Sequence, residues 1–176
     1  MATARERGER GVPGVTAVQE FTEVFRAEHR RVRDLLLGLA GAFGDRDTGR
    51  ALVAAVAETT GLHFRYEEEA MYPQLAGIFG DAYVGKLLAG HDGAIRNARE
   101  LLGLAGNDEL TEEQAGRGTE LTRQILPHVS DCDGLAIMVE TLPGGAAGRI
   151  LAARKAALGA GLDLLTWAAT ARDRRA

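Results

Sequence analysis

The residues most able to do chemistry are the four histidines of this 176-residue chain: His29, His63, His91 and His128. Each falls in a different helix-forming stretch, among apolar residues that recur at intervals of three and four. A single buried imidazole is ordinarily satisfied by ordinary hydrogen bonds, but four imidazoles in one core would need four separate partners. A metal supplies a partner to several at once, so the pattern indicates a metal site.

Acidic residues at fixed spacings from two of these histidines could complete such a site. Glu67 follows His63 by four residues in the segment HFRYEEEAMYP, so both side chains lie on one face of a helix. After the last histidine, Asp131 and Asp133 are the candidate carboxylates, and Cys132 occupies the i+4 position. Position i+5 is about 140° away around a regular helix, so Asp133 requires a widened turn, which the glycine that follows it permits.

Composition limits the class of protein. Hydrophobic residues make up 45% of the chain but aromatic residues only 5%, which favours helices over sheets. The net charge of −4 gives no electrostatic reason to expect a nucleic acid or an anionic membrane as partner. The single cysteine excludes an intrachain disulfide and suits a reducing compartment. With no secretory signal and no apolar run longer than residues 51–57, a cytoplasmic protein is expected.

Helical periodicity predicts two long helices in the first half of the chain. Apolar residues recur at intervals of three and four from Val18 onward, and Gly41 ends this first helix. A second stripe begins at Leu52 and is closed by Pro73. Residues 74–80 are then expected to form a turn.

Two more long helices follow, the third with Asp81 as its N-cap and the fourth opened by Thr111. After a break at residues 143–145, a last Ala-rich helical segment extends to about Ala171. The predicted fold is therefore all-α, an antiparallel up-down four-helix bundle with an extra C-terminal helix. The sequence predicts a disordered tail at residues 1–14 and the bundle at residues 15–142. A C-terminal helical extension, residues 143–176, is expected to pack on the bundle.

The four histidines are expected at one level of this bundle. His63 lies about nine residues before the end of its helix and His91 about ten after the start of the next, so both lie roughly 14 Å from the connecting loop. The other neighbouring pairs agree to within a boundary error of ~2–4 residues. The imidazoles and the carboxylate of Glu67 therefore converge on one point.

These residues resemble the hemerythrin family, the HHE cation-binding domains, over about residues 18 to 140. The resemblance rests on the isolated His29, on HFRYE from His63, on HDGAI from His91 and on HVSDCD from His128. It implies a four-helix bundle that holds two non-haem irons, bridged by two carboxylates and an oxo or hydroxo group. Matched position by position, it implies six metal ligands: His29, His63, Glu67, His91, His128 and Asp133.

The chain departs from the family's patterns at two positions. Ile95 stands where the oxygen carriers have a second helix-three histidine, and Cys132 stands where many bacterial relatives have glutamate. With two histidines for each metal, about one position on each iron stays open, which favours peroxide or dioxygen chemistry over reversible carriage. Imidazole and carboxylate ligands suit iron, with manganese or zinc as alternatives.

The resemblance leaves two functions open. One is a di-iron protein that reacts with dioxygen, peroxide or nitric oxide, with a catalase-like, oxidase or oxygenase activity. The alternative is a non-catalytic oxygen or iron sensor, carrier or store. Either function requires only a small ligand as partner, without nucleic acid or membrane, and suits a monomer or a homodimer.

Other residues near the histidines are expected to have structural roles. Exposed charges, facing solvent or the helix edges, are expected at four positions: Glu28, Glu68, Glu69 and Asp92. Packing is expected for the remaining three, on the helix surface for the tyrosines and as a small buried hydrophobe for the cysteine: Tyr66, Tyr72 and Cys132. The charged end that begins at Arg172 is assigned no function.

Overall fold

The structure, a computed structural model, describes residues 16–172, and every regular element in that range is helical. The all-α prediction is confirmed, while the tail predicted at residues 1–14 lies outside the described residues. No helix between residues 16 and 172 is long and apolar enough to cross a membrane. The elements are α1 (Ala17–Ala42), α2 (Arg46–Tyr66), a π-helix (Glu67–Met71), α3 (Tyr72–Phe79), α4 (Asp81–Ala105), α5 (Glu112–Asp133), α6 (Leu135–Met138), a 3-10 turn (Val139–Thr141), α7 (Ala146–Ala160) and α8 (Leu164–Thr170).

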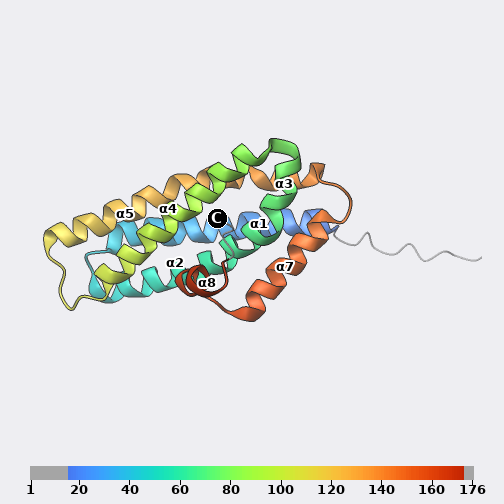
Figure 1. The fold of residues 1–176 in the computed structure, drawn as a ribbon. Helices are drawn as coiled ribbons and strands as arrows, with labels where there is room; N and C mark the ends of the chain where they lie inside the picture. The colour runs from blue at the N-terminus through green and yellow to red at the C-terminus, as the bar shows by residue number, and fades with distance from the viewer. Residues whose placement is uncertain (1–15, 173–176) are drawn as a thin grey trace, which may run out of the picture.

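The four long helices pack in neighbouring pairs, α1 against α2 and α5, and α4 against the same two helices. Figure 1 shows α1, α4 and α5 extending lengthwise along one another. Their buried apolar side chains form two clusters. On α1, Phe25 belongs to one cluster and Val32 to the other, with His29 between them. On α4, His91 lies in the same way between Leu87 and Ala94, so the histidines mark the boundary between two apolar halves of the core.

Helix starts follow the capping signals in the sequence. α1 and α5 each begin with a capping box, in which the side chain of Thr16 or Thr111 accepts a hydrogen bond from the backbone N–H of a glutamine three residues on. The prediction that Asp81 caps α4 is wrong. The N-cap is Gly80, at a φ of +79° that residues other than glycine rarely adopt. Asp81 lies in the first turn, where its negative charge interacts favourably with the helix dipole.

The second long helix does not end at Pro73, and residues 74–79 are helical, so both predictions are wrong. α2 passes into the π-helix, and α3 begins at Tyr72 with Pro73 in its first turn. A proline inside a regular α-helix lacks an N–H and clashes with the carbonyl four residues earlier. A wider turn relieves both problems, and the N–H of Tyr72 bonds to the carbonyl of Glu67, five residues back. Side chains at i and i+5 thereby come to one side of the helix.

The C-terminal segment forms two helices where one was predicted. The chain turns at Gly161, with φ of +59°, and Asp163 then caps α8. Both helices pack against α2, α7 also against α1, and α8 also against α4 (Figure 1). Gly61 of α2 permits this approach, because a Cβ there would lie 2.5 Å from the backbone of Asp163 and Leu164.

Candidate metal centre

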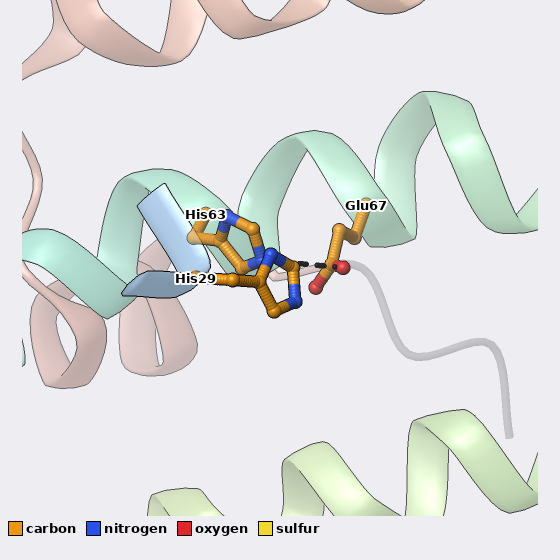
Figure 2. Close-up of side chains that lie close together, drawn as sticks. All are labelled: His29, His63 and Glu67. Atoms are coloured by element: carbon orange, nitrogen blue, oxygen red, sulfur yellow. Dashed lines mark ion pairs between the residues drawn. The ribbon is translucent and has the colours of Figure 1, made fainter. Parts of the chain in front are cut away.

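His29, His63 and Glu67 form a buried group of potential metal ligands between α1 and α2. One donor atom from each lies within 4.8 Å of the other two. His63 and Glu67 come from successive turns of one helix, with Nε2 and Oε1 separated by 3.3 Å, and His29 reaches them from α1 (Figure 2). The carbonyl oxygen of Phe25 accepts a hydrogen bond from Nδ1 of His29 at 2.9 Å, which orients that imidazole.

Glu67 also belongs to a second group, with His91 of α4 and His128 of α5. Its other oxygen, Oε2, lies 3.2 Å from Nε2 of His91. One carboxylate thus faces two pairs of histidines from opposite sides of the core. Such a shared carboxylate is the arrangement that dinuclear carboxylate centres in helical bundles require.

Two buried atoms of the first group have no hydrogen-bond partner. They are Nε2 of His63 and Oε1 of Glu67, which face each other at 3.3 Å in a geometry unsuited to a hydrogen bond. An unpaired buried polar atom costs about 1–3 kcal/mol, and a cation between the two would satisfy both. Imidazole nitrogens with a carboxylate are donors that iron, manganese and zinc accept. The residues therefore fit a metal centre.

Charge holds the first group together when no metal is bound. Burial lowers the pKa of His63, but the carboxylates of Glu67 and Glu28 outweigh burial and raise it to about 9. Burial likewise raises the pKa of Glu67, while the imidazoles of His63 and His91 bring it well below its ordinary value. A protonated His63 beside ionised carboxylates therefore takes the place of the cation in the metal-free chain.

Glu28 is a buried partner of His63, so the prediction that it is an exposed charge is wrong. Its exposed fraction is 8%, and Oε2 lies 3.0 Å from Nδ1 of His63. The hydroxyl of Tyr66 donates to the same oxygen at 2.7 Å, and Arg154 of α7 donates to Oε1 at 2.6 Å. Burial raises the pKa of Glu28, but its contacts with His63, Tyr66 and Arg154 bring it below the ordinary value.

Glu68 plays the same part for His91, again against the prediction of a solvent-facing charge. Its Oε1 lies 2.8 Å from Nδ1 of His91, and its side chain is only 8% exposed. Arg172 donates to Glu68 and also to Asp92, which is half-buried and therefore not the exposed charge predicted. Glu69, by contrast, is exposed as predicted and pairs with Arg65.

Two tyrosines predicted to pack on the helix surface are fully buried at the centre. Tyr66 donates its hydroxyl hydrogen bond to Glu28. The hydroxyl of Tyr72 lies 3.0 Å from Nε2 of His91, 3.3 Å from Oε2 of Glu67 and 3.9 Å from Sγ of Cys132. Burial, reinforced by the charge of Glu67, raises the pKa of Tyr72 well above its usual value, so this phenol keeps its proton at neutral pH.

Close packing shapes the second pair of histidines. The ring of Phe64 stacks on His91, with centroids 3.7 Å apart and planes inclined by 5°. Gly90 makes room for His128, because a Cβ at that position would lie 2.7 Å from Nδ1. Burial and the neighbouring His91 lower the pKa of His128 to about 4, which leaves it neutral at pH 7, the form that binds a metal.

The comparison with protein families agrees with this geometry. The family model of the hemerythrin HHE cation binding domain matches residues 20–136, more than half of the chain. This chain belongs to that family. No curated protein and no solved structure shows significant similarity to it. The part that matches the hemerythrin domain contains the four histidines and Glu67, and it ends before α7 and α8 begin.

The helix-four ligand of this hemerythrin domain was predicted to be Asp133, with its neighbours Asp131 and Cys132 as alternatives. Asp131 is exposed and therefore lies away from the centre. Cys132 is buried as predicted, but beside the ligands, with Sγ 3.7 Å from Nε2 of His128. α5 is helical as far as Asp133, and Gly134 follows it as the C-cap. The side chain of Asp133 lies outside the described part of the structure.

Little room remains beside the hemerythrin centre. A cavity of about 10 Å³ borders His29, His63 and His128 and is also lined by Phe64 and Val129. That volume accommodates about one water-sized molecule. This cavity therefore admits only a very small ligand.

Proposed function

We propose that this chain is a non-haem di-iron protein whose carboxylate-bridged centre reacts with dioxygen, peroxide or nitric oxide. The observation that carries the proposal is the position of Glu67, with one oxygen toward His63 and the other toward His91. In the proposal, His29 and His63 hold one iron and His91 and His128 the other. Asp133 supplies the second bridging carboxylate. The helices that carry these ligands then form the antiparallel four-helix bundle of the family.

Bound iron would supply redox and Lewis-acid chemistry toward a small oxygen-containing ligand. The protein's own contribution begins with the orientation of the imidazoles. Glu28 and Glu68 each accept a hydrogen bond from Nδ1 of a histidine, so that Nε2 of His63 and of His91 faces Glu67. A carboxylate on the far nitrogen fixes the tautomer and increases the basicity of the nitrogen that binds the metal.

Tyr72 is the residue best placed to provide a proton. Its Oη lies 3.3 Å from Oε2 of Glu67, within the second ligand group, and burial keeps the phenol protonated at neutral pH. A proton held at this oxygen could be donated to a ligand at the centre without bulk water. Phe64 and Val129 present apolar side chains to the small cavity that borders His29, His63 and His128. These features favour a reaction with peroxide or dioxygen over simple storage of iron.

The proposal is tested by adding hydrogen peroxide to the iron-loaded protein and measuring the oxygen that evolves. Evolution over many turnovers, reduced about ten-fold or more in Tyr72→Phe, is the result expected if Tyr72 supplies a proton. Tyr83→Phe, a change at a partly buried tyrosine of α4 whose ring contacts Phe79, is the control and should have no effect. Reversible binding of dioxygen with no turnover would support a carrier or sensor in place of an enzyme. A cytoplasmic location and a monomeric or homodimeric state are further parts of the proposal.

A further inference from the structure

Glu28 and Glu68, the two carboxylates that orient the histidines, each contact an arginine from the C-terminal extension. Nε of Arg154, in α7, lies 2.6 Å from Oε1 of Glu28, whose other oxygen contacts His63. Arg172, just after α8, contacts Glu68, whose Oε1 lies 2.8 Å from Nδ1 of His91. Both arginines lie beyond residue 136, where the match to the hemerythrin domain ends. The extension therefore reaches each half of the centre by a separate chain of contacts.

The contact with Glu68 is two-pronged. Nε of Arg172 lies 2.9 Å from Oε2 and Nη2 lies 2.5 Å from Oε1, while Nη1 contacts Asp92 at 2.9 Å. The guanidinium also lies over the ring of Trp167, 5.4 Å from its centre. The side chains of Arg172 and Glu68 are 7% and 8% exposed. A buried ion pair of this kind adds little net stability, so its geometric effect is the informative part.

The extension is fixed closely enough to hold these guanidinium groups in place. α8 lies against α2 at Gly61, where no Cβ would fit, and Asp163 caps the first turn of α8. Trp167 is buried in the same apolar cluster as Phe64, the ring that stacks on His91. The backbone N–H of Arg172 bonds to the carbonyl of Trp167 at 2.9 Å. The backbone that carries Arg172 is therefore held in place by the packing of α8.

We infer that Arg154 and Arg172 are positioning residues, each acting on one of the two metals. Arg154 acts through Glu28 on the pair His29 and His63, and Arg172 acts through Glu68 on the pair His91 and His128. Held by a guanidinium, each carboxylate is kept from rotating away from Nδ1, so the imidazole presents Nε2 to the centre. The inference rests on the proposed function, because it requires two metals at the centre.

Release of iron tests this inference. Protein loaded anaerobically with ferrous iron is mixed with an excess of a ferrous chelator, and the release of each iron is followed by absorbance. Arg172→Met should lose one of its two irons about ten-fold faster than the wild type and keep the wild-type rate for the other. Arg154→Met should behave in the same way, and the double variant should release both irons fast. One fast phase covering both irons in a single variant would overturn the assignment of one arginine to one metal.

Arg117→Met is the matched control. Arg117 contacts Glu100 through the same two nitrogens, at 2.7 and 2.9 Å, but this pair is exposed and joins α4 to α5 without touching a histidine. The control should release iron at wild-type rates, and an acceleration as large as in Arg172→Met would overturn the inference.

If a methionine variant does not fold, Arg172→Lys and Arg154→Lys carry the test. Both keep the charge, but Arg172→Lys loses the two-pronged contact with Glu68 and Arg154→Lys loses the Nε donor to Glu28, so each should release one iron several-fold faster than the wild type. Wild-type rates in both would overturn the inference. A wild-type chain that takes up no iron would instead overturn the proposed function.

Discussion

Nε2 of His63 and Oε1 of Glu67 face each other across 3.3 Å in the interior of the protein, and neither forms a hydrogen bond. The two atoms form an ion pair, but buried polar atoms in natural proteins are nearly always hydrogen-bonded as well. The other nitrogen of His63, Nδ1, contacts both Glu28 and Tyr66, so only the nitrogen that faces the centre lacks a hydrogen bond. This relationship is the structural reason to expect a cation, and it makes Glu67 the residue whose loss should matter most.

Glu67→Gln should abolish the binding of both metals. The carboxylate faces both groups of histidines, so its replacement by a neutral amide removes a ligand from each. Iron content per chain should fall close to zero, and iron should no longer raise the melting temperature, as both elemental analysis and thermal unfolding can measure. Glu69→Gln, on the same π-helix but exposed and paired with Arg65, should bind iron as the wild type does. Retention of one iron by Glu67→Gln would show that the carboxylate is not shared.

The stability of the metal-free chain should fall as pH rises from about 7 to 9. The pKa of His63 is raised from 6.5 to about 9, so in this window the folded chain holds a proton that the unfolded chain has released. The stabilisation is fully present below pH 6.5 and is lost as pH rises through about 9. This contribution to the free energy of unfolding should be on the order of 3 kcal/mol, and its loss is measurable by urea unfolding at the two pH values. The lowered pKa of His128 acts only below pH 6.5, so it does not contribute.

Iron should remove this pH dependence. The ion takes the place of the proton at Nε2 of His63, so loading near pH 7.5 should release about one proton per chain from this residue. His63→Gln should lack the slope in the metal-free form and serves as the control. An equal slope in the iron-loaded and metal-free proteins would mean that the metal does not bind at His63.

The sequence predicted the histidines and Glu67 because their signal is local. Each histidine lies on the apolar stripe of its own helix, and Glu67 follows His63 by one regular turn. The partners of those histidines were missed because they depend on contacts that helical periodicity does not contain. Glu28 lies beside the stripe of α1 and is buried because α7 covers it, through Arg154.

The π-helix accounts for the other partners that were missed. On a regular helix Tyr72 would point about 140° away from Glu67, and Glu68 would lie off the buried stripe. In the wider turn, the hydroxyl of Tyr72 comes within 3.3 Å of Glu67, and Glu68 reaches His91. The one available signal was Pro73, which was interpreted as a helix end. A wider, π-helical turn also accommodates a proline, and such turns are frequent at functional sites.

Gly90→Ala should weaken metal binding more than it weakens the fold. The added Cβ would lie 2.7 Å from Nδ1 of His128, a side chain that can move aside when no metal holds it. The metal-free protein should therefore melt within a few degrees of the wild type, while the affinity for one iron falls about ten-fold or more. Gly85→Ala is the control on the same helix, because its Cβ would meet open space, and it should stabilise both forms by about 0.5–1 kcal/mol. Equal effects of Gly90→Ala on the two forms would place His128 outside the metal site.

Asp133→Ala should reduce iron binding, whereas Cys132→Ala should retain it. Burial raises the pKa of the Cys132 thiol, as does the nearby charge of Glu67, so this sulfur is a poor ligand while it stays protonated. Asp131→Ala, a change at an exposed position of the same turn, is the control and should have no effect. Loss of iron in Cys132→Ala, with retention in Asp133→Ala, would show that the sulfur coordinates the metal.

The number of irons per folded chain tests the central claim most directly. The purified protein is loaded anaerobically with ferrous iron, freed of excess metal, and analysed for iron and protein, with Glu67→Gln treated in parallel. The account predicts about two irons per chain in the wild type, and near-ultraviolet absorption after oxidation. One iron per chain, or none, in a wild-type protein that is folded would contradict it.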